Sequence, residues 1–333
     1  MTAAAGRPAF LVTIDTEGDN LWARPRTITT RNAGFLPRFQ ALCETCGLRP
    51  TYLTDYEMAT SAAFQAFGRD VLARGTAEIG MHLHAWNTPP IEPLTADDFA
   101  HQPYLVEYPP RVMEEKIARL TGLLEDTFQT GVRSHRAGRW CLDETYARLL
   151  ARRGYRVDCS VTPHVSWRSH RGAPGGRGGA DYTRFPQDAY VLDLDDIARP
   201  GRSPLLELPM TVVRVRSRLP GWLRGVAARV PKAARALERV APTVRWLRPD
   251  GRNRAALLAI VREAVARGRP YVQFMLHSSE LMPGGSPRFR NAAAIERLYR
   301  DLEALFAYAR THCRGATLSE YAAAVRPEPV EVA

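Results

Sequence analysis

Short apolar runs alternate with longer amphipathic stretches along most of the chain, and this alternation limits its fold more than any other feature. The apolar runs are PAFLVTI (8–14), RPTYLT (49–54), AEIGMHL (77–83), GVRSHRA (131–137), YRVDCSV (155–161), PLLELPMTV (204–212) and PYVQFMLH (270–277). Helical periodicity is expected at 34–46, 62–75, 111–128, 142–154, 254–268, 295–312 and 317–325. Parallel strands need long crossovers, which helices usually provide. The sequence therefore predicts a parallel α/β fold with about seven strands.

Several other classes of protein do not fit the sequence. No GxGxxG motif follows the first strand, so a dinucleotide-binding fold is not supported. No run of 18 or more apolar residues is present, so no membrane-spanning helix is expected. The start, MTAAAGRPAFLVTID, lacks a basic region followed by a long apolar one, as a secretory signal would have. We therefore expect a cytoplasmic protein with a single catalytic domain over residues 1–333.

The five cysteines are scattered along the chain, as in proteins of a reducing compartment. Cys43 and Cys46 form a CxxC motif, but it comes near the end of a helical stretch that stops at Gly47. A redox CxxC would be expected at the start of a helix, and no second CxxC is present to complete a zinc site. We expect these cysteines to be structural.

The formal net charge of +11 comes mostly from arginine, and much of it lies in the segment 214–254. Arginines alternate there with Leu, Val, Trp and Ala. Such a segment fits a peripheral contact with an anionic membrane, at the inner face for a cytoplasmic protein, or a contact with an anionic substrate. It fits equally a helical insertion whose arginines face water. No recognition motif accompanies the charge, so nucleic-acid binding is not expected.

Polar side chains gather where the predicted strands end. Asp15 and Glu17 follow the first strand two residues apart, and His82 and His84 follow the third with the same spacing. In an extended chain, residues two apart point to the same face. His277 ends the last long strand. Because the carboxyl ends of the strands of a parallel barrel meet on one side, these side chains are expected to share a site.

The residue types suggest a metal site with an acid and a base beside it. One carboxylate and two imidazoles commonly bind zinc or a similar divalent ion and leave positions open for water. A second carboxylate can act as general base, and a separate histidine can protonate a leaving amine. Asp15, Glu17, His82, His84 and His277 supply each of these roles. The plain alternatives are a turn capped by Asp15 and Glu17, and a metal bound by His82 without His84.

The segments TIDTEGD, EIGMHLHAW, SHRAGRW, ELPMTV and FMLHSSEL resemble, in order and spacing, the motifs of the polysaccharide deacetylase family. These are the NodB-homology carbohydrate esterases, similar to carbohydrate esterase family 4. The resemblance covers roughly residues 8–325, least well in 170–254. It implies a distorted (β/α)7 barrel and a divalent metal, zinc in the first place, with Co, Ni, Mn or Fe as alternatives.

Residue roles follow from the resemblance position by position. Asp15 resembles the catalytic base, and Arg136 resembles the arginine that orients it. His277 resembles the catalytic acid. Glu17, His82 and His84 are the implied metal ligands, although the family spaces its two histidines four apart and Trp86 stands at that position. Asp19 is an alternative metal carboxylate.

The resemblance also implies substrate contacts. Those expected to touch substrate are Trp86, Arg139, Trp140, Ser278 and Glu280, and the backbone N–H near Arg139 would help hold the oxyanion. Ser278 and Glu280 are alternatively expected to orient His277. Asp158 is expected to pair with Arg136 or with His277. His135 and His164 are expected to be structural or peripheral.

The implied reaction is hydrolysis of an N-acetyl group on an amino sugar, in cell-envelope or exopolysaccharide synthesis. A cytoplasmic enzyme would meet a glycan precursor linked to a lipid or a nucleotide rather than finished wall polymer. Two alternatives remain open. One is a non-sugar amidohydrolase on the same scaffold, allantoinase-like or acting on a small metabolite, whose partner is a small-molecule amide. The other is a non-catalytic carbohydrate-binding relative.

Overall fold

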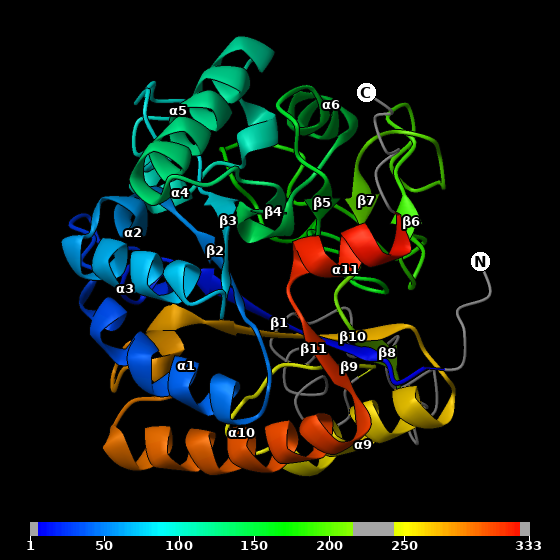
Figure 1. The fold of residues 1–333 in the computed structure, drawn as a ribbon. Coiled ribbons are helices and arrows are strands. Elements are labelled where there is room, and N and C mark those ends of the chain that lie inside the picture. Colours follow the sequence, from blue (N-terminus) through cyan, green and yellow to red (C-terminus); the bar gives the residue numbers. More distant parts are fainter. Residues whose placement is uncertain (1–5, 216–242, 327–333) are drawn as a thin grey trace, which may run out of the picture.

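The computed structural model describes residues 6–215 and 243–326, and its centre is a curled, largely parallel β-sheet (Figure 1). Its strands follow the order β10-β1-β2-β3-β4-β5-β7 and are all parallel. Their bounds are β10 Tyr271–His277, β1 Ala9–Thr16, β2 Thr51–Thr54, β3 Glu78–Leu83, β4 Ser134–Ala137, β5 Val157–Asp158 and β7 Leu206–Glu207. These are the seven apolar runs of the sequence, so the predicted parallel α/β fold is confirmed.

Short strands absent from the prediction complete the sheets. β6 (Tyr190–Val191) pairs antiparallel with β7, and β11 (Arg314–Ala316) pairs with the first residues of β1. β8 (Val212–Arg214) and β9 (Val244–Trp246) form a separate antiparallel ribbon. Each has only two or three residues, too few for a period-two pattern to stand out.

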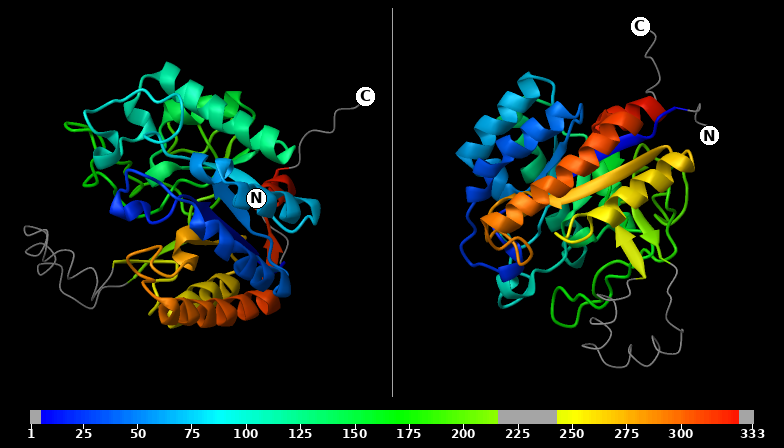
Figure 2. Two further views of the ribbon diagram at one scale, coloured as in Figure 1. Left: turned by 90° about the vertical axis from the view of Figure 1, so that its left-hand side faces the viewer. Right: turned by 90° about the horizontal axis from the view of Figure 1, so that it is seen from below.

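Helices surround the outer side of the curled sheet (Figure 1). Their bounds are α1 Leu36–Thr45, α2 Tyr56–Thr60, α3 Ala62–Ala73, α4 Asp98–His101, α5 Pro110–Phe128, α6 Glu144–Arg152, α9 Arg254–Ala266, α10 Ala292–His312 and α11 Leu318–Val325. In the described part of the chain, 3-10 turns lie in the loops at η1 Leu21–Ala23, η2 Arg31–Phe35, η3 Leu105–Glu107, η4 Gly138–Trp140 and η5 Ser278–Leu281. Figure 2 shows α9 and α10 side by side near β10. None of the helices within the described ranges has the length and apolar character needed to cross a bilayer.

The strands and helices form for ordinary physical reasons. All eight residues of β1 are buried, as expected for a parallel strand covered on both faces. Side-chain caps begin α6 at Asp143 and α10 at Asn291, and Thr317 and Glu320 form a capping box at α11. The main core lies between the sheet and the outer helices.

A second, smaller core lies on the other side of β1 and β10. It joins Leu11 of β1 and Tyr271 of β10 to Leu318 and Tyr321 of α11. Because α11 follows β11, which pairs with the start of β1, it packs near the amino ends of these strands. The opposite ends, where the strands finish, are left for the site.

The sheet does not close by strand pairing between β7 and β10. Irregular chain bridges the two instead: the N–H of Gln273 donates to Thr211 Oγ1 at 2.8 Å, and the N–H of Met275 donates to the carbonyl of Leu247 at 3.2 Å. The fold is therefore a curled, incompletely closed barrel, which agrees with the expected distorted (β/α)7 barrel.

Two further sequence predictions concern segments away from the expected site, the cysteines and the basic segment 214–254. Cys43 and Cys46 are buried at the end of α1, and all five cysteines are free and buried, as expected for structural residues. Most of the predicted basic helical insertion at 214–254, namely residues 216–242, lies outside the described residues. Its described flanks belong to the β8–β9 ribbon rather than to a helix, because Val212–Arg214 finds an antiparallel partner in Val244–Trp246.

Candidate active site

The residues predicted to act in catalysis or metal binding meet at the carboxyl ends of the parallel strands. Asp15 near the end of β1 lies opposite His277 at the end of β10. His82 of β3 lies opposite Arg136 of β4. Glu17 and His84 come directly after β1 and β3. The strand register therefore brings together residues that lie far apart in the sequence.

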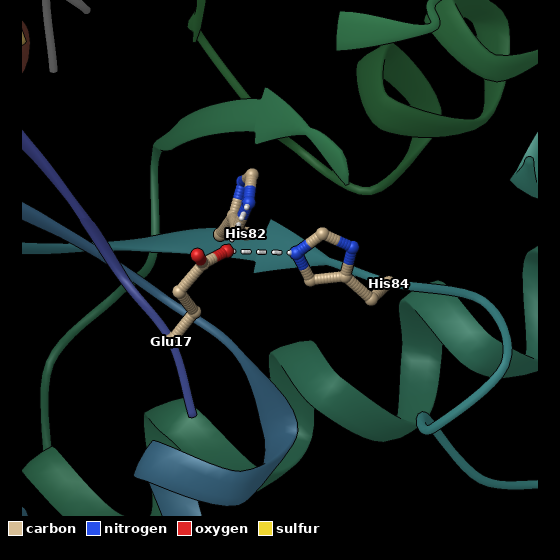
Figure 3. Close-up of side chains that lie close together, drawn as sticks. All are labelled: Glu17, His82 and His84. Carbon is tan, nitrogen blue, oxygen red and sulfur yellow. Dashed lines mark hydrogen bonds and ion pairs between the residues drawn. The ribbon is translucent and has the colours of Figure 1, made fainter. Parts of the chain in front are cut away.

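Glu17, His82 and His84 form a compact, buried cluster (Figure 3). One ligand atom from each residue lies within 4.8 Å of the others. His84 Nε2 is 3.1 Å from Glu17 Oε2, and His82 Nε2 is 3.7 Å from the same oxygen. The two rings meet edge to face. His82 and His84, two positions apart at the end of β3, thus both direct their imidazoles toward one carboxylate.

This cluster fits a divalent metal ion. His82 Nδ1 lies 2.9 Å from the backbone carbonyl of Arg136 and can donate to it, which leaves the Nε2 lone pair facing Glu17. A histidine held in this way by a carbonyl is the usual arrangement of a metal ligand. Two imidazole nitrogens and a carboxylate oxygen suit zinc and similar ions. His84 Nδ1 is buried without a partner among the described residues, so that ring is held less firmly.

The electrostatics keep two members of the cluster, Glu17 and His84, in the protonation states that bind a metal, whereas Asp15 and Glu17 raise the pKa of His82, which must lose its proton when an ion binds. Burial lowers the pKa of His84 to about 4, so its imidazole is neutral near pH 7. Burial opposes ionisation of Glu17, but His277 and the hydrogen bonds from His82 and His84 outweigh it and hold the pKa of Glu17 below its usual range. A neutral imidazole and an ionised carboxylate are the states that bind metals.

Asp15 is fixed by a buried arginine. The Arg136 Nη1 group donates to Asp15 Oδ1, while Nη2 donates to Thr13 Oγ1 at 2.9 Å and Nε to the carbonyl of Cys159 at 3.2 Å. Burial favours the neutral acid, but the guanidinium of Arg136 overcomes it and holds the pKa of Asp15 below its usual range. Asp15 is therefore an ionised, oriented carboxylate beside the cluster.

His277 points between the two carboxylates. Its Nε2 is 3.7 Å from Asp15 Oδ2 and 3.8 Å from Glu17 Oε1. On the other side of the ring, Nδ1 lies 3.2 Å from Glu280 Oε2 and 3.0 Å from Arg248 Nη2. Whichever of these two partners Nδ1 bonds, Nε2 stays directed toward the cluster.

A pocket of about 330 Å³ opens above these groups. Its walls are rich in aromatic side chains, with Trp22, Trp86, Trp140, Trp167 and Tyr104 around it. Gln102, Arg139, His170 and Arg248 add polar edges. Flat aromatic faces beside a few polar groups suit a ring-shaped polar ligand.

The predicted substrate contacts divide into two groups. Trp86, Arg139 and Trp140 line the pocket as expected. Ser278 does not line it: its hydroxyl accepts from the N–H of Glu17 at 3.1 Å and lies 3.2 Å from the Glu17 carbonyl, and so fixes the backbone of Glu17. Glu280 is also buried outside the pocket, where it orients His277, the alternative that the sequence had left open.

Two carboxylates have other partners than the sequence suggested. The carboxylate of Asp19 is hydrogen-bonded within the loop after β1, where its oxygens accept from Thr29, Arg31 and Asn32. It is therefore not a metal ligand in this arrangement. Asp158 pairs with neither Arg136 nor His277. It bonds the Nδ1 group of His135, whose Nε2 bonds the Tyr146 hydroxyl at 2.7 Å.

The two peripheral histidines have the places expected of them. His135 is fully buried in the network with Asp158, which makes it structural. His164 bonds the Nε group of Arg214 at 3.1 Å and lines a different pocket.

Several pocket residues were not foreseen. Trp22, Tyr104, Trp167, His170 and Arg248 all come from loops that follow strands. The one usable signal was position, since aromatic and basic residues in such loops converge on the mouth of a parallel barrel. No spacing rule marks them individually.

Comparison of the chain with known proteins supports the fold. Neither a protein-family model nor a curated protein sequence matches the chain. A candidate glycoside hydrolase/deacetylase of Parabacteroides distasonis superposes with a TM-score of 0.60 at 12% identity, covering 97% of this chain and 73% of that one. A candidate polysaccharide deacetylase of Mycobacterium smegmatis gives a TM-score of 0.51 at 17% identity, covering 98% and 92%.

A third solved structure shows that this architecture is not confined to deacetylases. The 4-alpha-glucanotransferase of Thermococcus litoralis gives a TM-score of 0.51 at 12% identity over 95% of this chain and 40% of that one. At these identities the likeness concerns the fold. The chain has a fold of the NodB-like polysaccharide deacetylase type, as its motifs predicted.

Proposed function

We propose that this protein is a metal-dependent hydrolase that removes an N-acetyl group from an amino sugar. The observation that carries the proposal is the cluster of Glu17, His82 and His84 beside the Asp15–Arg136 pair and His277. These six residues supply a metal site, a base and an acid within one pocket.

Glu17, His82 and His84 would hold the ion. A divalent ion bound to them would supply a Lewis acid for the amide carbonyl and for a water molecule.

Asp15 is placed to take the proton from the attacking water. Its Oδ1 is occupied by Arg136, and its Oδ2 is 3.7 Å from His277 Nε2 and so faces the reacting side. Arg136 keeps Asp15 ionised and fixed in one orientation. A general base in this position typically contributes a factor of about 10² to 10⁴ in rate.

His277 is placed to protonate the departing amine through Nε2. Glu280 and Arg248 hold the ring from behind at Nδ1. The indole of Trp22 packs edge to face against the His277 ring, with 4.8 Å between the centroids. When the C–N bond breaks, the proton from Nε2 goes to nitrogen and the acyl group leaves as a carboxylate.

The aromatic walls favour a sugar over a small flexible amide. Trp86 packs against His84 with centroids 4.4 Å apart, and Trp140 and Trp167 both pack against Trp246. Such fixed rings offer faces for the apolar side of a pyranose. Linear small-metabolite amides use little of this area, so they remain the less favoured candidates.

Release of acetate tests the proposal. The protein is purified metal-free, reloaded with Zn²⁺ or Co²⁺, and incubated with N-acetylglucosamine, its oligomers, nucleotide-linked N-acetylglucosamine and allantoin. Acetate release from a sugar that is lost in Asp15→Asn supports the proposal. Hydrolysis of allantoin alone would move the assignment to the non-sugar amidohydrolases, and the absence of any hydrolysis in the metal-loaded protein would contradict it.

A further inference from the structure

Arg139 stands out among the charged residues of the pocket. Its guanidinium lines the pocket and lies over the ring of Tyr104, 4.1 Å from the centroid. Its Nη1 donates to the carbonyl of Gln102 and its Nη2 to the carbonyl of Arg171 at 2.9 Å. These partners are an aromatic face and two neutral carbonyls, and a guanidinium has five N–H donors in all.

The other arginines of the site are neutralised. Arg136 pairs with Asp15, and Arg248 pairs with Glu280 at 3.0 Å. Within residues 6–215 and 243–326, Arg139 has no carboxylate partner at ion-pair distance. A partly buried cation without a counter-ion is costly, and a bound anion removes that cost.

Two neighbouring charged side chains, Arg24 and Glu107, act on Arg139 in opposite senses. Arg24 is close enough to Arg139 to repel it electrostatically, and it too donates to a backbone carbonyl, that of Ala100. The Glu107 carboxylate stabilises the Arg139 cation without forming an ion pair with it within the described residues, and it accepts from the backbone N–H groups of Tyr104 and Ala173. Two arginines are thus held near each other by neutral groups.

The backbone holds Arg139 in an unusual conformation. Arg139 has φ 56° and Trp140 has φ 61°, so two consecutive residues with side chains adopt left-handed geometry. Such geometry is unfavourable for residues with a side chain and persists where the surroundings impose it. Together with Gln102, Arg171 and Tyr104, this loop fixes the guanidinium before any ligand arrives, which reduces the entropy lost on binding.

We propose that Arg139 binds an anionic group carried by the substrate, a phosphate ester or a carboxylate attached to the acylated sugar. The planar guanidinium pairs with either oxyanion through two parallel N–H donors. The identity of the sugar rests on the function proposed above, whereas the anion site rests on Arg139 and its contacts alone.

The first experiment compares three probes: N-acetylglucosamine, N-acetylglucosamine 1-phosphate and N-acetylmuramic acid. We expect kcat/KM to be at least tenfold higher for one of the two anionic probes than for the neutral one. Which of them is preferred distinguishes phosphate from carboxylate. In Arg139→Gln we expect this preference to fall at least fivefold. Equal kcat/KM for all three probes, or an unchanged preference in the variant, would overturn the proposal.

The second experiment does not depend on catalysis. Inorganic phosphate is titrated into the metal-free protein, and binding is followed by tryptophan fluorescence, since Trp22, Trp140 and Trp167 line the same pocket. We expect saturable binding that Arg139→Gln weakens about tenfold. Phosphate binding without any deacetylation would refute the proposed function and keep the anion site. No phosphate binding, or equal binding by the variant, refutes the anion site.

Matched variants separate the charge from the fold. Glutamine keeps an unbranched chain of similar length at the left-handed position of Arg139. Arg139→Lys keeps the charge but lacks the planar fork, so we expect intermediate phosphate binding. Arg133 is a matched control: it lies directly before the first residue of β4, at the end of the strand away from Arg139, and it also donates to a backbone carbonyl, that of Gly154, at 3.0 Å. Arg133→Gln is expected to bind phosphate as the unmodified protein does.

Discussion

Arg136 contacts Asp15 through its side chain and His82 through its backbone carbonyl, so one residue of β4 positions both the proposed base and a proposed metal ligand. The side chains of Arg136 and Asp15 are 0% and 2% exposed. A pair so deeply buried is stabilising only while both partners are present.

Replacing Arg136 with Gln is therefore expected to destabilise the protein by roughly 3–5 kcal/mol, because it leaves the Asp15 carboxylate buried and unpaired. Urea denaturation measures the change. The double variant Asp15→Asn/Arg136→Gln should recover a large part of the loss. Arg38→Gln, which breaks an exposed pair with Glu296, should cost no more than about 1 kcal/mol. A double variant less stable than the single one would contradict this account.

The metal cluster predicts one divalent ion per chain. Changing Glu17 to Gln, His82 to Ala or His84 to Ala is expected to lower Zn²⁺ affinity at least tenfold, measured by competition with a chelating dye. His82→Ala should have the larger effect of the two histidine changes, since only the His82 ring is held by a backbone carbonyl. His164→Ala serves as the control, and a loss of affinity there would argue against the assigned ligands.

The stability of the metal-free protein should depend on His84 in acid. Burial lowers the pKa of His84 from 6.5 to about 4, so the unfolded chain binds this proton more readily. The contribution is present above pH 6.5 and is lost as the pH falls toward 4. A shift of this size corresponds to about 3 kcal/mol. In His84→Asn we expect a shallower loss of unfolding free energy between these two pH values.

His82 provides the matching control for this pH effect. Burial lowers its pKa, but Asp15 and Glu17 outweigh burial and raise it. Its stabilising contribution is therefore present at low pH and is lost as the pH rises past its usual value. His82→Asn should change the pH dependence of stability in the opposite sense to His84→Asn, and the same sign for both variants would refute the assignment.

Glu280 should act through His277. Replacing Glu280 with Gln removes the charge that holds Nδ1 and leaves Arg248 without its carboxylate partner. On the proposed reaction we expect kcat to fall roughly tenfold or more, with KM changed less, because protonation of the amine is affected and not binding. The limb of the pH profile of kcat that reports the general acid should shift as well. Glu296→Gln, another arginine-paired glutamate, is expected to leave kinetics unchanged.

Gly138 should be intolerant of a side chain. A Cβ there would lie 2.3 Å from the Leu83 carbonyl oxygen and 2.8 Å from His84 Nδ1. Gly138→Ala is therefore expected to displace His84, with weaker Zn²⁺ binding and a lower Tm. Gly122, half-buried in α5, has no atom of the described residues within 4 Å of a built Cβ. Gly122→Ala should stabilise the protein by about 0.5–1 kcal/mol through helix propensity, with metal binding unchanged.

The strand and helix order was predictable because buried parallel strands are short, apolar and separated by periodic helices. Each of the seven apolar runs became a strand. The short strands β6, β8, β9 and β11 were missed, since two or three residues carry no period of their own. Their formation depends on a partner already in place, as Arg314–Ala316 depends on the start of β1.

The metal cluster was predictable from local spacing, because residues two apart on a strand share a face. His82 and His84 follow this rule, and Glu17 is brought to them by the strand order. Ser278 and Glu280 were placed on the right segment, but their partners are Glu17 and His277 and not substrate. Spacing alone does not tell which side of a tight turn faces a cavity.

Loop residues were the least predictable. Trp22, Tyr104, Trp167 and Arg248 reach the pocket through irregular chain whose path is set by many individual hydrogen bonds. Asp158 illustrates the same point, because its choice of His135 over Arg136 depends on side-chain packing that no pattern records.

The hydroxyl of Ser278 joins the backbone of Glu17 across 261 positions of the chain. During synthesis, an emerging chain that already contains Asp15, Glu17, His82 and His84 would still lack the segment that locks Glu17 in place. Contacts of such sequence separation form late and slow folding. We therefore expect ribosome-bound chains that stop before β10 to hold Zn²⁺ poorly, with metal capture following release of the full-length chain.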